Sequence, residues 1–537
     1  MYRRLFRNNA FRNSRFNYLP MKALMVVLLL WGSSALGQVP FLPASESTNK
    51  GDVFAGFAEY KSQYYFCGSR EAGLSGQGED SLSGFCIKTD SNGQVLKRFN
   101  LSLLGPNHYI KFNDVGAKND HIYITGAVGY VDTVAHRQYL NKIFVLCLTT
   151  DLNLISMDAF AFGQNHTAAL LRMKTVFLKD RIVMGYCSGL NQSINFDQSY
   201  LTVYDYNLNR IRHQFIDQTY LNCASTGAHN VLTGLQKSSD TTFTAFAQLQ
   251  NTSYNALLID TGLHILEWAG NLAARPHLPN ARRNNKIPVL DDCSGLWHPS
   301  GAYFLGPVVA TDSGNRLGVS KLANAQDTLR TSGVLPSYPY MGRSAVYAAT
   351  ESSLQLLHNQ KEIIALGTNM NAGYTQASNA MLVAKYDTAL NLLWYRSLSK
   401  ANHAFGVAGI YELANHRLMV LASAYDFTTA ATARTQQNLY AFILDSTGTA
   451  LSTFTVPVPV QEVVSVYPNP SQDRIRFKLP AAASQATYTL TDLQGKIVRS
   501  GSYVSGEEIS VENLAPANYI YQVRTSDGVV HAGMFTR

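Results

Sequence analysis

Aspartate residues recur along the 537-residue chain, each where a short apolar stretch ends. In the stretch DYNLN, Asp205, Asn207 and Asn209 occupy alternate positions, as the oxygen ligands of a calcium loop do. Calcium requires at least about six oxygen ligands, including a distal carboxylate, and no acidic residue follows at that spacing. Because Asp, Asn and Gly favour tight turns through local hydrogen bonds, we interpret the recurring aspartates as hairpin-turn residues.

The remaining chemistry-bearing residues show no spacing that is typical of a metal or catalytic site. The sequence lacks the nucleophile-elbow, P-loop, H-E-x-x-H and dinucleotide-binding patterns, so it predicts no metal, no cofactor and no catalytic residue that a motif would identify. A hydrolase or lyase that gathers its side chains from scattered positions stays open as an alternative. We interpret seven of the 13 histidines as surface or turn residues: His108, His121, His166, His213, His229, His264 and His298.

The six cysteines include no C-x-x-C pair, which argues against a zinc or redox motif. Four of them fall within apolar stretches and are expected to be buried free thiols: Cys67, Cys86, Cys147 and Cys187. Cys223 and Cys293 lie in connecting segments and are the better candidates for a disulfide, which export from the cell would permit.

The composition favours strands and gives little support to nucleic-acid binding. Charged residues make up 15% of the chain, while Tyr and Phe are abundant, at 30 and 25 residues. The net charge of +8 is concentrated at the start, because residues 1–37 hold six basic residues and no acidic one. The rest of the chain therefore carries only +2, and we expect no nucleic-acid partner.

The N-terminal region has the three parts of a secretory signal peptide. Lys22 precedes the apolar run 23–31, and small residues, Ala35 and Gly37, follow it. We predict cleavage between Gly37 and Gln38, with Met21 as an alternative start of translation. The apolar run is too short for a permanent membrane helix, so the mature protein is expected to have no transmembrane span.

The middle of the chain repeats itself at intervals of roughly 54 to 64 residues. Each copy holds four short strands joined by tight turns, which predicts a seven-bladed β-propeller of four-stranded blades over residues 38–460. Six or eight blades, or an array of β-sandwiches, are the alternatives. The recurring turns are at Asp90, Asp151, Asp205, Asp260, Asp387 and Asp445, with a degenerate copy around Ala323. The strands that precede them are 64–69, 122–127, 181–186, 241–246, 302–307, 362–367 and 417–422.

Residues 461–537 are predicted to be a linker followed by a small β-sandwich. This part contains YPNP at 467–470, LTDLQGK at 490–496 and LAPANY at 514–519. The order and spacing resemble the type A C-terminal sorting domain of the type IX secretion system. Ala517-Asn518 stands where the family usually has Gly, and Asn tolerates the turn that Gly supplies.

The resemblance implies an Ig-like fold and passage through the outer membrane by the type IX secretion machinery. It also implies removal of the domain, with release or attachment to surface lipopolysaccharide. An Ig-like module without a sorting role is the alternative. The motif residues that carry the resemblance are Pro468, Asn469, Pro470, Asp492, Gly495 and Tyr519.

Loop lengths give the functional hint. The connections between second and third strands are expected to be long in several blades and to share one face with the connection 270–292. Variable loops on a rigid scaffold are common binding sites, and aromatic side chains among neutral polar groups suit glycans or proteins. The hypothesis is a secreted binding propeller; a polysaccharide hydrolase or lyase, or a structural or adhesion component of the cell surface, are alternatives. The expected loops are 69–83, 128–141, 187–198, 368–379 and 424–437, and their candidate ligand-binding aromatics are Tyr130, Phe196, Tyr374, Tyr425 and Phe427.

Overall fold

The structure is a computed structural model, and the residues that it describes form β-strands and no α-helix. Within this part of the chain, no helix is long and apolar enough to cross a membrane. The described residues are 50–72, 83–101, 108–132, 137–161, 173–189, 196–216, 230–249, 253–270, 294–310, 314–322, 329–332, 353–368, 380–426, 438–456, 464–480, 483–492, 495–526 and 530–537.

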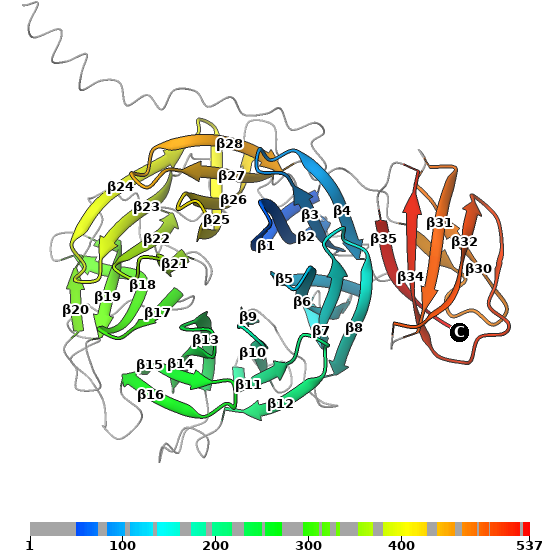
Figure 1. Cartoon of the computed structure of the whole chain (residues 1–537), viewed down its shortest axis with the longest axis horizontal. Helices are drawn as coiled ribbons and strands as arrows, with labels where there is room; N and C mark the ends of the chain where they lie inside the picture. The colour runs from blue at the N-terminus through cyan, green and yellow to red at the C-terminus, as the bar shows by residue number, and fades with distance from the viewer. Residues whose placement is uncertain are drawn as a thin grey trace, which may run out of the picture. The chain divides into compact units, whose positions relative to one another are not determined.

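The first twenty-eight strands of the described residues form seven antiparallel meanders of four strands each (Figure 1). Blades 1 to 4 consist of β1 (Lys50–Tyr60), β2 (Gln63–Ala72), β3 (Ser83–Thr89) and β4 (Val95–Leu101); β5 (His108–Lys118), β6 (His121–Asp132), β7 (Arg137–Thr149) and β8 (Leu154–Ala161); β9 (Lys174–Phe177), β10 (Ile182–Gly189), β11 (Phe196–Tyr204) and β12 (Arg210–Phe215); and β13 (Asn230–Lys237), β14 (Thr242–Leu249), β15 (Ser253–Asp260) and β16 (Ile265–Gly270). Blades 5 to 7 consist of β17 (Ser294–His298), β18 (Gly301–Ala310), β19 (Gly314–Leu322) and β20 (Leu329–Ser332); β21 (Leu354–Leu356), β22 (Glu362–Thr368), β23 (Ala380–Asp387) and β24 (Leu392–Ser399); and β25 (His403–Glu412), β26 (Leu418–Asp426), β27 (Asn438–Leu444) and β28 (Ala450–Val456).

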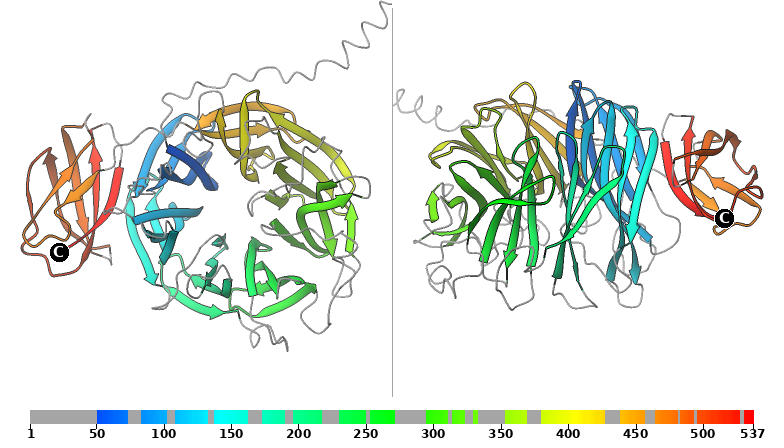
Figure 2. Two further views of the ribbon diagram at one scale, coloured as in Figure 1. Left: turned by 180° about the vertical axis from the view of Figure 1, so that it is seen from behind. Right: turned by 60° about the horizontal axis from the view of Figure 1, so that its bottom comes forward.

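The meanders are arranged in a ring, so the chain folds as a β-propeller (Figures 1 and 2). Consecutive inner strands contact each other around the ring, and β1 contacts β25, β26 and β27 of the last blade. A core of aromatic and aliphatic side chains fills each of several interfaces; the one that closes the ring joins Phe57 and Phe66 of blade 1 to Met419 and Leu421 of blade 7. Among the strands that the structure describes, none is exchanged between the first and last blades, because β1–β4 and β25–β28 are each contiguous in sequence. Closure therefore depends on side-chain packing and on contacts between turns.

The turns that join third and fourth strands share one hydrogen-bond pattern. At Asp445, carboxylate Oδ1 accepts the backbone N–H groups of Thr447 and Thr449 at 2.8 and 2.9 Å, and Gly448 has a φ of 80°. At Asp205 the same carboxylate accepts two backbone N–H groups and the side-chain amide of Asn209. The hairpin-turn interpretation of the aspartates is thus confirmed there, and also at Asp90, Asp260 and Asp387.

Blade 2 departs from the prediction by two residues. The hydroxyl of Thr149 accepts the backbone N–H groups of Asp151 and Asn153 at 3.2 and 3.1 Å, and Leu152 has a φ of 56°. The expectation that Asp151 starts this turn is wrong, because a Thr hydroxyl can accept the same backbone N–H groups as an Asp carboxylate. Asp151 instead forms an ion pair with Lys88 of blade 1, at 2.9 Å.

Leucines occupy the left-handed position of four of these turns, with φ between 56° and 67°. Left-handed backbone costs a residue with a Cβ atom on the order of 1 kcal/mol. The cost is offset because each leucine side chain is buried in the core of a blade or of the interface beside it. The four are Leu152, Leu208, Leu263 and Leu390.

Three of the expected loop aromatics lie in strands instead. Tyr130 is in β6, Phe196 is the first residue of β11 and Tyr425 is in β26. In blade 2 the strands stay paired as far as Asp132 and Arg137, so the connection spans residues 133–136 rather than 128–141. The loop prediction failed there because backbone hydrogen bonding continues through polar residues that the sequence pattern assigns to a loop.

Residues 464–537 form a small β-sandwich, as predicted. One sheet has the strand order β35-β34-β31-β32 and the other β29-β30-β33. Tyr503 of the first sheet bonds the second, since its hydroxyl donates to the carbonyl of Phe477 at 2.8 Å and accepts the N–H of Phe477 at 2.9 Å. The strands are β29 (Ser465–Tyr467), β30 (Arg474–Lys478), β31 (Gln485–Thr491), β32 (Ile497–Val504), β33 (Ile509–Ser510), β34 (Asn518–Thr525) and β35 (Val530–Thr536).

The motif residues of this sandwich have structural partners. Asp492 accepts the backbone N–H of Lys496 at 2.9 Å in the turn where Gly495 has a φ of 82°. Asn469 accepts the N–H of Thr536 at 2.9 Å, and the Tyr519 hydroxyl donates to a backbone carbonyl at 2.8 Å. Pro468 and Pro470 each follow a cis peptide bond. Asn518 does not use left-handed backbone; it begins β34 and pairs with Thr536.

Among the cysteines, Cys67, Cys86 and Cys147 are buried free thiols, as expected. Cys187 lies in β10, but its side chain is outside the described part of the structure. Cys223, Cys293 and the predicted cleavage residues Gly37 and Gln38 also lie outside the described residues.

Candidate metal centre

Two neighbouring blades carry inner hairpin turns of the same construction. The turn from β21 to β22 begins at Leu357 and the turn from β25 to β26 begins at Leu413, and both leucines are buried. Each leucine carbonyl accepts a hydrogen bond from the residue three positions later, which has left-handed backbone: Gln360 at φ 57° and His416 at φ 61°. The two turns therefore present equivalent positions on adjacent blades.

Glu412 links these two turns. It is the last residue of β25, its side chain is 9% exposed, and carboxylate Oε2 accepts the backbone N–H of His358 in the turn of blade 6. The next joint around the ring, which is the interface between blades 7 and 1, has the same bond. Glu59, near the end of β1, accepts the backbone N–H of Ala414 at 2.7 Å. The carboxylate of Glu412 is thus first a structural acceptor that holds blade 6 against blade 7.

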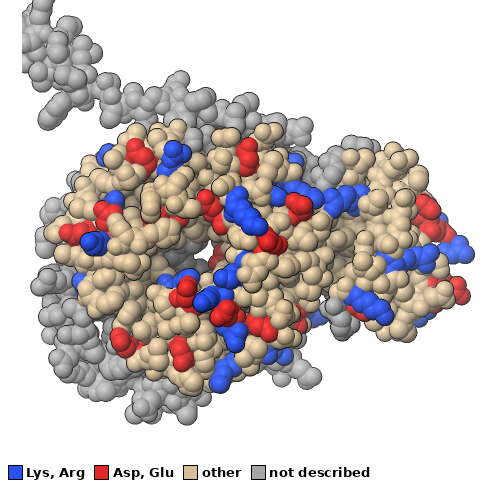
Figure 3. Space-filling view, in the orientation of Figure 1, with Lys and Arg blue, Asp and Glu red and all other residues tan. Residues whose placement is uncertain are grey.

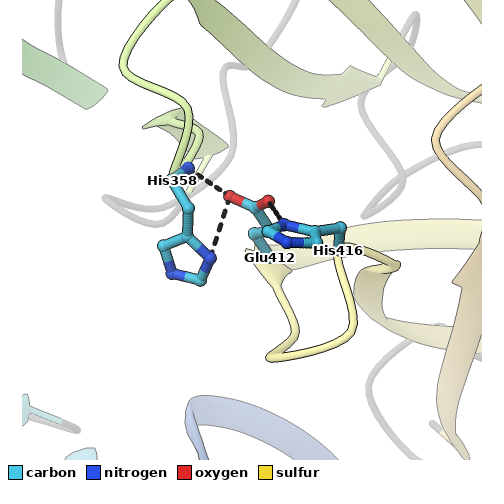
Figure 4. A group of neighbouring side chains, drawn as sticks. All are labelled: His358, Glu412 and His416. Carbon is cyan, nitrogen blue, oxygen red and sulfur yellow. Dashed lines mark hydrogen bonds and ion pairs between the residues drawn. The ribbon is translucent and has the colours of Figure 1, made fainter.

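Two imidazole rings flank the Glu412 carboxylate (Figure 4). Nδ1 of His416 lies 2.9 Å from Oε1, and Nδ1 of His358 lies 3.4 Å from Oε2. The ring centroids are 6.0 Å apart, and one ligand atom from each of the three residues lies within 4.8 Å of the others. The side chains of His358 and His416 are 60% and 71% exposed, so the cluster is open to solvent. The Glu412 carboxylate is held in place by its hydrogen bond to the His358 N–H.

This donor set is chemically suited to a transition metal. Imidazole nitrogen together with carboxylate oxygen matches Zn²⁺ and its neighbours in the first row, whereas Mg²⁺ and Ca²⁺ prefer all-oxygen sites. Without a metal, the same contacts act as two exposed histidine–carboxylate pairs of small energetic value.

A second polar group of note lies on the inner strand of blade 2. Strands β1, β5, β13 and β25 each carry a register shift, and the residue after the shift is Gly in three of them and Asp114 in β5. A Cβ atom added to the corresponding Gly56 of blade 1 would lie 2.3 Å from Oδ1 of Asp114, so the two strands approach closely here. Burial raises the pKa of the Asp114 carboxyl to about 8, although the N–H of Val115 and the charge of Lys174 oppose the shift.

The charged side chains in view are of mixed sign. Figure 3 shows Lys and Arg interspersed with Asp and Glu around a central hollow in the ring. Among the described residues, Lys61 forms an ion pair with Asp120 and Lys237 forms one with Asp240.

The predicted ligand-binding aromatics stay a prediction. Tyr130, Phe196 and Tyr425 have described backbone in strands, but their side chains are outside the description. Tyr374 and Phe427 lie wholly outside the described residues. The structure does place two of the scattered histidines at turns, as expected: His264 bonds to Asp260, and His298 lies 2.7 Å from the Ser300 hydroxyl.

The histidine–glutamate cluster was not found from the sequence. Glu412 and His416 are four residues apart, which is a visible but common spacing. His358 lies 54 residues earlier, and it joins the cluster only because consecutive blades are neighbours. Superposing the turn sequences LHNQKE and LANHR would have identified the shared frame, but not the approach of the side chains.

Comparison with known families identifies the C-terminal part. Residues 465–533 match the model of the secretion system C-terminal sorting domain. This type IX sorting domain indicates export to the cell surface or the extracellular space, as the sequence resemblance implied. A search of curated proteins finds no match to the chain.

Solved structures similar to the chain have low sequence identity. Cobalt-substituted apocarotenoid oxygenase from Synechocystis has 9% identity and a TM-score of 0.39, with 78% of this chain and 96% of that chain covered. The β-propeller domain of the Trilobed protease from Pyrococcus furiosus has 10% identity and a TM-score of 0.29, with 62% and 95% covered. A family GH43 β-1,3-galactosidase has 8% identity and a TM-score of 0.29, with 64% and 93% covered. Likenesses of this size carry no argument about activity.

Proposed function

We propose that the propeller, exported by its type IX sorting domain, binds an extracellular glycan or protein on the face opposite the tight turns. The observation that carries this proposal is the asymmetry of the blade connections. In a meander, the first and third connections lie at one end of the strands, and the second connection lies at the other end together with the link to the next blade. The first and third connections that the structure describes are short turns whose backbone groups form hydrogen bonds, whereas residues 323–328 of blade 5, with the degenerate repeat at Ala323, lie outside the described residues.

At the other end of the meanders, longer stretches of sequence separate the described strands. Residues 73–82, 369–379 and 427–437 join second to third strands, and residues 271–293 link blade 4 to blade 5. Long connections on a rigid scaffold supply the variable surface on which ligands are usually bound.

Three of the candidate aromatic residues belong to strands that end on this side of the blades. Tyr130 lies near the end of β6, Phe196 begins β11 and Tyr425 lies near the end of β26. All three strand ends border second-to-third connections. Aromatic rings beside neutral polar groups provide the stacking and hydrogen bonding that sugar or peptide ligands use.

The test is a binding screen with the mature full-length chain against a panel of polysaccharides and extracellular proteins. Substitution of Tyr130, Phe196 and Tyr425 together by Ala should weaken retention on the true ligand at least about tenfold, which is the loss expected for removing aromatic anchors. Tyr395→Ala is the matched control, because Tyr395 is a 43% exposed aromatic on the outermost strand β24. Equal retention by the triple variant and the wild type would refute this location for the site.

The second candidate is a polysaccharide hydrolase or lyase, and Asp114 is the observation that favours it. A carboxyl with a pKa of about 8 is protonated at neutral pH, which is the state that a general acid requires. New reducing ends or unsaturated sugars are measured in the same binding reactions. If they form with the wild type and not with the Asp114→Asn variant, the propeller is an enzyme and not a binding module. Retention without products would exclude this second candidate for the glycan concerned.

A further inference from the structure

We propose that His358, Glu412 and His416 bind one divalent transition-metal ion of the zinc class at the joint between blades 6 and 7. His358 comes from the turn of blade 6, and Glu412 and His416 come from the end of β25 and the turn that follows it in blade 7. Their ligand atoms already lie within 4.8 Å of one another. Two imidazoles and a carboxylate form a donor set that zinc accepts, with a remaining position for water or for an atom of a bound ligand.

The framework holds the central ligand in place before any ion arrives. The bond from the His358 N–H fixes Glu412 Oε2, and the 9% exposure of this side chain limits its movement. The left-handed backbone of His416 brings its ring back over the end of β25. A metal site whose ligands are positioned by other bonds loses less entropy when the ion binds.

The next joint of the ring shows what the same framework looks like without the imidazoles. Glu59 occupies the place of Glu412 and accepts the N–H of Ala414, which corresponds to His358. Gln360 occupies in blade 6 the left-handed position that His416 has in blade 7. The structural bond between blades is therefore made without histidine, and the two histidines of the joint between blades 6 and 7 are additions to it.

This comparison supplies substitutions that the fold already tolerates. His358→Ala copies Ala414, and His416→Gln copies Gln360 with its left-handed backbone. Both variants keep Glu412 and its bond to the backbone of residue 358. The matched control is His264→Gln, because His264 lies 3.0 Å from Asp260 and is 70% exposed, but forms a two-residue pair.

The experiment titrates the mature full-length chain, carrying no histidine tag and stripped with chelator, with ZnCl₂ and in parallel with CoCl₂ and MgCl₂. The wild type should bind one more equivalent of Zn²⁺ than the His358→Ala/His416→Gln double variant, and each single variant should bind that equivalent at least about tenfold more weakly. Co²⁺ bound by the wild type should show a visible absorption band that the double variant lacks. Mg²⁺ should not compete, because it prefers oxygen ligands.

Thermal unfolding provides an independent readout. An ion that binds only the folded chain raises the melting temperature, so Zn²⁺ should stabilise the wild type and His264→Gln more than the double variant. Equal Zn²⁺ stoichiometry and affinity in the wild type and in the folded double variant would overturn the proposal. Loss of the equivalent in His264→Gln, with retention in the double variant, would overturn it as well.

Discussion

The carboxylate of Glu59 accepts a hydrogen bond from the backbone N–H of Ala414 at 2.7 Å, across 355 positions of sequence. The bond joins the first blade to the last, and the described residues of these two blades exchange no strand. It belongs to a series, because Glu412 makes the equivalent bond to the turn of blade 6. Turn-to-turn hydrogen bonds therefore complement the apolar core in closing the propeller.

Replacing this carboxylate should loosen the closure of the ring. Glu59→Ala leaves the N–H of Ala414 without its acceptor, and we expect the free energy of unfolding to fall by about 1 kcal/mol. Glu59→Gln retains an acceptor oxygen and should lose less. Urea unfolding followed by tryptophan fluorescence measures both; equal stability of Glu59→Ala and the wild type would show that packing alone closes the ring.

A second prediction concerns the leucines with left-handed backbone. Leu390 has a φ of 67° and is 2% exposed, so its side chain offsets the cost of its backbone by packing. Leu390→Ala should cost about 2–4 kcal/mol of unfolding free energy, as buried Leu to Ala changes do. Leu390→Gly should cost about 1 kcal/mol less than Leu390→Ala, because glycine adopts positive φ freely.

That order is the reverse of the usual one in strands and helices, where glycine is less stable than alanine. Equilibrium unfolding of the two variants decides it. Leu366→Ala and Leu366→Gly form the control pair, since Leu366 is fully buried within strand β22, and there glycine should be the less stable substitution. If Leu390→Gly also proved less stable than Leu390→Ala, backbone strain at this turn would be negligible.

The fold could be predicted from the sequence where the sequence signal comes from a few consecutive residues. The recurring Asp turns and their spacing predict meanders because a turn is fixed by four or five consecutive residues, as at Asp445. The prediction slipped by two residues at Asp151, where Thr149 makes the same bonds with a hydroxyl. The predicted end of the strand was wrong at Tyr130 for a related reason, because residue type does not show whether a residue is hydrogen-bonded to a neighbouring strand.

The candidate metal centre could not be predicted in the same way. His358 and His416 become neighbours only through the packing of blade 6 against blade 7, and no local pattern records that approach. The sorting domain is the opposite case: its motif residues each serve a turn or a sheet contact within the same small sandwich, so their order in the sequence carries the information.

A third prediction is a pH dependence of stability that arises from Asp114. The pKa of this carboxyl is raised by burial from 3.8 to about 8, so the folded chain keeps a proton that the unfolded chain releases. The contribution to stability is fully present below about pH 4 and is lost as pH rises towards 8. Relative to Asp114→Asn, the wild type should lose at least about 1 kcal/mol between pH 5 and pH 7.

Urea unfolding of both proteins at several pH values provides the measurement. Asp473→Asn is the control for the loss of one carboxylate, because Asp473 is exposed in the C-terminal sandwich. A constant stability difference between the wild type and Asp114→Asn across this range would contradict the shift.

The last prediction concerns the buried thiols of an exported chain. Cys67 and Cys86 face each other in register on β2 and β3, and both are buried and free. Burial raises the pKa of the Cys67 thiol well above its ordinary value and that of Cys147 to about 11, so little of the reactive thiolate is present at neutral pH. We therefore expect iodoacetamide at pH 8 to leave these three cysteines unmodified in the folded chain and to modify them in urea. Peptide mass spectrometry measures each site separately, and as the pH is raised over the range in which the chain stays folded, Cys147 should begin to react first.

A disulfide-linked Cys67–Cys86 peptide from the exported protein would contradict this prediction, because it would show that the opposed thiols are oxidised before or during burial.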